Sequence, residues 1–104
     1  MTLETFGELI ASLEIPAVYG YYKNEQATPY IAYVAVEKNV IHADGVVVYS
    51  EPWIQLQLIT QTRDLTAEVS VEELLTENGI AFDVPDLDFD EKQGIHIATY
   101  NFPL

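Results

Sequence analysis

Three aspartates alternate in the last fifth of the chain, at Asp86, Asp88 and Asp90, and Glu91 follows them directly. Clustered carboxylate oxygens are the ligands that hard cations such as calcium prefer. The calcium loop of an EF-hand does not fit, because its turn glycine would fall at Glu91 and its bidentate acid at Ile97. Acids that alternate with apolar residues are typical of the solvated face of a strand. We therefore expect no metal site here.

The chain has two histidines, His42 and His96, and either could act as a general base beside a carboxylate. No neighbouring residue in the sequence would become an activated nucleophile, and His96 is expected on the opposite strand face from the isoleucines that flank it. None of the serines lies in a Gly-x-Ser-x-Gly motif, and the five glycines are too dispersed for a phosphate-binding loop. We predict that the protein is not an enzyme and binds no cofactor.

Charge limits the partners that the protein can bind. The 104 residues include four Lys and Arg against seventeen Asp and Glu, a formal net charge of −13. The cations are scattered, so no basic patch is expected to bind nucleic acid or an anionic membrane. The acidity has two interpretations: self-repulsion that keeps the protein soluble, or a surface past which DNA moves without binding.

Composition also limits the compartment and the domain count. The chain has no cysteine, no signal-peptide pattern at its start and no apolar run near the ~20 residues of a membrane span. We therefore expect a soluble protein made in a cytoplasm, without disulfides. Residues 1–104 are expected to form a single domain.

Apolar residues at helical spacing predict an amphipathic helix over residues 2–14. Thr2 or Thr5 is expected to cap its start, and Thr5 with Glu8 fits a capping box. Pro16 is expected to end the helix, because the residue before a proline is disfavoured in a helical conformation.

Extended segments follow this helix. Strands are predicted over residues 17–22, 30–37, 46–49 and 53–62, of which the second is apolar on both faces. The last alternates between an apolar face and a polar face, although Trp53 and Ile59 lie on the polar side. Residues 37–50 include the turn-prone pairs Lys-Asn and Asp-Gly, and they predict a protruding hairpin arm or a long loop.

A second helix is predicted over residues 64–78, with Asp64 as its cap and Asn78-Gly79 as its left-handed end. A hairpin follows, from residues 81–89 to 95–102, with a bulge at Val84-Pro85-Asp86 that would explain a shift in apolar parity. The expected fold is α+β, with a mainly antiparallel sheet, two helices on one of its faces and the order α-β-β-β-β-α-β-β.

Aromatic residues suggest an interaction surface. Tyr and Trp anchor interfaces well, because one end of each side chain is apolar and the other can remain hydrated. Most of these residues are needed for the core, but two helices leave one face of the sheet free for a neighbouring subunit. The residues that we expect at a subunit or tube interface are His42, Asp44, Val47, Tyr49 and Trp53.

Several segments together resemble a known family. The first ten residues, Pro-Tyr-Ile at 29–31, Ala-Asp-Gly at 43–45 and Glu-Asn-Gly-Ile at 77–80 are similar, in order and spacing, to tail-completion or tail-terminator proteins of long-tailed phages of Gram-positive bacteria. The resemblance covers nearly the whole chain.

This resemblance implies a virion protein at the head–tail junction. It implies a small α+β subunit in a homo-oligomeric ring, expected to be a hexamer, that caps the tail tube and meets the head connector. It also implies that the 37–50 arm reaches beyond its own subunit. DNA would cross the lumen without specific binding, and acidic residues would line that lumen.

Three alternatives remain open. A head-completion or connector protein of the same virion would belong to the same structural class. An acidic module that mimics DNA for a nucleic-acid enzyme is supported by the charge alone. An enzyme with a site built from distant segments is the third.

Overall fold

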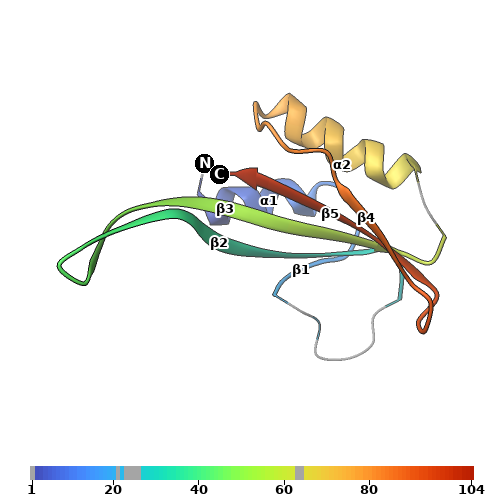
Figure 1. Ribbon diagram of the computed structural model, residues 1–104. Coiled ribbons are helices and arrows are strands. Elements are labelled where there is room, and N and C mark those ends of the chain that lie inside the picture. Colours follow the sequence, from blue (N-terminus) through green and yellow to red (C-terminus); the bar gives the residue numbers. More distant parts are fainter. Residues whose placement is uncertain (1, 21, 23–26, 63–64) are drawn as a thin grey trace.

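The computed structural model describes residues 2–20, 22, 27–62 and 65–104, without the side chains of residues 37–40 and 47–51. Two helices lie against a five-stranded sheet with the strand order β1-β2-β3-β5-β4 (Figure 1). β1 runs parallel to β2, and the other neighbouring strands are antiparallel. The elements are α1 (Leu3–Ala11), β1 (Ala17–Tyr19), β2 (Tyr30–Ala43), β3 (Val46–Thr60), α2 (Leu65–Glu77), β4 (Asp86–Asp90) and β5 (Ile95–Pro103).

The expected α+β fold is confirmed, and its elements follow the expected order once two of the predicted strands are counted as one. The two extended segments predicted at residues 46–49 and 53–62 lie in one continuous strand, β3. Pro52 does not break this strand, although it has no N–H to donate. β2, predicted to be central or covered, lies between β1 and β3.

Thr2 is the N-cap of α1, where its hydroxyl oxygen accepts a hydrogen bond from the Thr5 N–H at 3.1 Å. The helix ends at Ala11, so the predicted end near residue 14 was wrong. The Ser12 hydroxyl donates to the Leu9 carbonyl at 2.6 Å, and Glu14 has a φ of 61°. The helix therefore ends because the Ser12 side chain bonds to the backbone and Glu14 adopts a left-handed conformation. Both residues precede Pro16, which was expected to end the helix.

The end of α2 agrees with its prediction. Gly79 has a φ of 70°, its N–H donates to the Thr76 carbonyl, and the Ile80 N–H donates to the Leu75 carbonyl at 2.9 Å. These two bonds form a Schellman motif, which glycine favours because it adopts positive φ without steric cost. The predicted cap, Asp64, lies outside the described residues.

Both helices cover the same face of the sheet, as expected (Figure 1). β3 directs Ile54, Leu56 and Leu58 into this layer, all 0–1% exposed. The strand registers place apolar residues of β2 and β5 beside them. The buried residues of the core are Phe6, Ile10, Ile31, Ile54, Leu56, Leu58, Ala67, Val71, Leu75, Ala98, Tyr100 and Phe102.

The C-terminal hairpin differs from its prediction at its start. Residues 81–85 are irregular, and β4 begins only at Asp86. Phe82 packs on the ring of Tyr100 from this irregular segment, whereas Leu87 faces the helix layer from a strand. The shift in apolar parity therefore marks the start of β4, and no bulge within a longer strand is needed to explain it.

β2 and β3 extend past the rest of the sheet. The register of β1 with β2 ends at Tyr33, and that of β3 with β5 ends at Trp53. The two strands continue together as a curved two-stranded ribbon (Figure 1). We call residues 37–50 of this ribbon the arm.

The arm should contribute little to the stability of the domain. Ile54→Ala should lower the free energy of unfolding by about 2–5 kcal/mol, because Ile54 is fully buried. Ile41→Ala removes the same atoms from an arm residue that is 55% exposed, and it should change stability by no more than about 0.5 kcal/mol. Urea unfolding of both variants tests this, and comparable losses would show that the arm packs with the core.

Candidate interaction site

The arm ends in a two-residue turn at Asp44 and Gly45. Their φ angles are 52° and 77°, as a type I′ hairpin turn requires at both central positions. The Asp-Gly pair thus forms the turn that its sequence favours. The other turn-prone pair, Lys38-Asn39, lies within β2, where the register with β3 shifts between Lys38 and Ile41.

Four of the five predicted interface residues lie on the arm. His42 and Asp44 are exposed near the tip. The backbones of Val47 and Tyr49 pair with His42 and Ile41, and their side chains lie outside the described part of the structure.

Trp53, the fifth predicted residue, lies at the base of the arm. It pairs with Val36 and with Pro103 and is partly exposed. Val46 lies seven positions before Trp53 in β3, which corresponds to roughly 23 Å along a strand. The predicted residues therefore follow the length of a ribbon, and they do not converge on one pocket.

Two large apolar side chains are exposed near the tip of the arm. Ile41 is 55% exposed and Val46 is 63% exposed. Single exposed apolar residues are common, but these two lie on a hairpin that extends away from the body of the protein (Figure 1). The tip is therefore well placed to contact another molecule.

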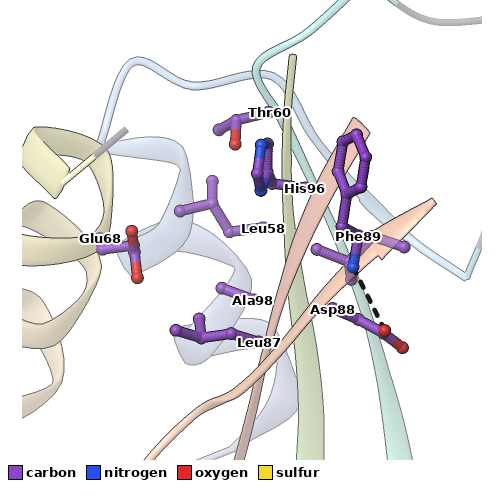
Figure 2. Close-up of a pocket in the computed structure, with 9 residues that line it drawn as sticks. Leu58, Thr60, Glu68, Leu87, Asp88, Phe89, His96 and Ala98 are labelled. Carbon is purple, nitrogen blue, oxygen red and sulfur yellow. Dashed lines mark hydrogen bonds between the residues drawn. The ribbon is translucent and has the colours of Figure 1, made fainter. Parts of the chain in front are cut away.

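A groove at the other end of the sheet was not predicted from the sequence. Figure 2 shows it between α2 and the strands, with Glu68 reaching toward it from the helix. Its volume is about 240 Å³, below the ~300 Å³ at which small-molecule sites usually begin. The residues that line it are Leu58, Thr60, Glu68, Leu87, Asp88, Phe89, His96, Ile97 and Ala98.

The groove is apolar where β4 and β5 meet the helix layer. Leu87 is opposite Ala98 and Phe89 is opposite His96, so all four are on the helix-covered face. The rings of Phe89 and His96 lie 4.7 Å apart between centroids. Leu87 and Phe89 are each 51% exposed, so the apolar layer continues past the helices and reaches solvent.

His96 is on the opposite strand face from its neighbouring isoleucines, as predicted, because it pairs with Thr60 while Ile97 pairs with Ile59. His42 is on the arm, so the two histidines are on different elements. Among the described residues, no group of three His, Cys, Asp or Glu side chains is placed to hold a metal ion.

Carboxylates dominate the two elements beside the groove. α2 contains four glutamates and β4 contains three aspartates, and neither contains Lys or Arg. The β4 aspartates share the face of the sheet that the helices do not cover, since they pair with Thr99, Ile97 and Ile95. Asp90 has a structural role as well, because its carboxylate accepts the Lys92 N–H at 3.0 Å in the β4–β5 turn.

No family model and no curated protein matches the chain. In the part of the chain that the structure describes, no helix is long and apolar enough to cross a membrane.

The row of aspartates on β4 should destabilise the fold at low salt. Asp88 lies roughly 7 Å along the strand from both Asp86 and Asp90. Asp88→Asn removes this repulsion and keeps an oxygen that can accept the Phe89 N–H. We expect a gain in unfolding free energy of roughly 0.5 kcal/mol at 10 mM salt.

The gain should disappear near 1 M salt, where the Debye length is only ~3 Å. Urea unfolding of both proteins at the two salt concentrations measures this change. A gain that persists in high salt would assign the effect to hydrogen bonding instead of charge.

Proposed function

We propose that the protein is a virion structural protein, a tail terminator that forms a ring at the end of a phage tail tube and joins the tail to the head connector. It would be made in the host cytoplasm and act in the virion. The observation that carries this proposal is the arm, which extends from the sheet and exposes Ile41 and Val46 near its tip.

The shape of the subunit supports a ring. The molecule measures 48 × 32 × 25 Å, and the arm extends it along one direction (Figure 1). An arm that binds a different surface on the next copy makes a heterologous contact, and such contacts close into rings when the rotation allows it. A hexamer is the expected ring, on the resemblance to tail terminators.

The charge supports the proposed location. A formal charge of −13 on each subunit would give the ring lumen a strongly negative potential. Phosphates would then be repelled from the wall, and DNA would pass without being held. The site is made of surfaces, so this function involves neither catalysis nor a cofactor.

The mass of the protein in solution and on tail tubes tests this proposal. We expect a ring in solution, or a monomer that becomes a ring at tube ends, as measured by native mass spectrometry and electron microscopy. Val46→Glu should weaken ring formation by roughly tenfold or more, because it places a charge at an apolar contact. Val69→Glu makes the same change at a site on α2 that is 49% exposed, and it should leave the ring intact.

Other outcomes identify the alternatives. A monomer that ignores tubes and binds a nuclease would contradict the proposal and favour a DNA mimic. A ring that binds only the isolated head connector would favour a head-completion protein.

A further inference from the structure

We infer that the groove between α2 and the β4–β5 hairpin receives the arm tip of a second copy of the chain. This inference rests on the proposed function, since it names the contact that would build the ring. It commits to one occupant, the tip residues Ile41 to Val46, and to one receiving surface, formed around Leu58, Leu87 and Phe89.

The positions of the two surfaces favour contact between copies. In Figure 1 the arm tip lies at one end of the long direction of the molecule, and the β4–β5 turn lies at the other. The tip and the groove of one chain therefore lie toward opposite ends of a molecule whose longest extent is 48 Å. Each copy therefore offers a tip at one end and a groove at the other, which is the arrangement of a head-to-tail assembly.

The two surfaces are also complementary in chemistry. The groove has an apolar wall of Leu58, Leu87, Phe89 and Ala98 that remains partly open to water. Its volume of about 240 Å³ suits a few side chains better than a large ligand. Docking Ile41 or Val46 there would remove apolar surface of both partners from water.

Charge favours the arm over the acidic surfaces of a second copy. α2 and β4, the two elements beside the groove, together carry seven carboxylates and no Lys or Arg. The arm, residues 37–50, carries Glu37, Lys38 and Asp44, so its formal net charge is only −1. The arm therefore approaches the groove against less repulsion than a second surface as acidic as α2 or β4 would experience.

The chain has no cysteine, so introduced thiols test this contact directly. A Val46→Cys protein is mixed with a differently tagged Leu87→Cys protein under mild oxidation, in solution and on tail tubes. A disulfide forms only when the two Cα atoms come within about 7 Å. We expect a covalent pair of one chain of each kind, formed roughly tenfold or more faster than in the control mixture, because docking raises the effective thiol concentration.

The control mixture pairs Val46→Cys with Ala11→Cys, which places an exposed thiol on α1. A second variant tests the groove without a disulfide: Leu87→Glu should weaken assembly by roughly tenfold or more, whereas Val69→Glu, at a site of similar exposure, should not.

The outcomes separate this inference from the proposed function. A ring that forms on tubes while the 46–87 mixture reacts no faster than its control overturns the arm-in-groove contact and leaves the terminator proposal standing. Selective 46–87 pairs in filaments or in complexes that ignore tubes support the contact and contradict the terminator. A monomer in both settings, without selective pairing, overturns both.

Discussion

The one-sided burial of β3 is the interaction on which the rest of the structure depends. Ile54, Leu56 and Leu58 alternate with polar residues, so only one register of this strand places all three under the helices. β2 and β5 pair with β3 on either side, and their own core residues follow from that register. A slip by one residue would expose the whole row, which explains why a sheet with one covered face can still have a unique arrangement.

The same constraint explains which features were predictable. Helix and strand patterns are local, and the alternation in β3 and the Asn78-Gly79 end of α2 were both found. The end of α1 was predicted too late, because only Pro16 was considered as a helix terminator. The Ser12 hydroxyl bond and the left-handed Glu14 end the helix earlier. The continuity of β3 through Pro52 was missed, because proline disrupts a strand only where the missing N–H would donate to a neighbouring strand. The sequence alone does not show which positions donate.

The two candidate surfaces also differ in whether the sequence could predict them. The arm has a local signal, Asp44-Gly45 between apolar runs, and its turn follows from that pair alone. The groove has none, because it exists only where α2 passes above β4 and β5. One hint was present: Glu68 precedes Val71 and Leu75 at helical spacing, which places a carboxylate on the buried stripe of α2, and it is only 7% exposed.

The net charge then limits how such subunits can assemble. Screening at physiological salt reaches only about 8 Å, so carboxylates brought face to face between two copies still repel each other. Apolar contact alone is not enough for self-association, because the approaching segment must also carry little negative charge. The arm meets both conditions, since it exposes Ile41 and Val46 and its 14 residues carry a formal net charge of only −1. A strongly acidic chain can in this way remain separate in solution and still make one specific contact, because two copies repel each other less when the arm leads the approach than when α2 or β4 does.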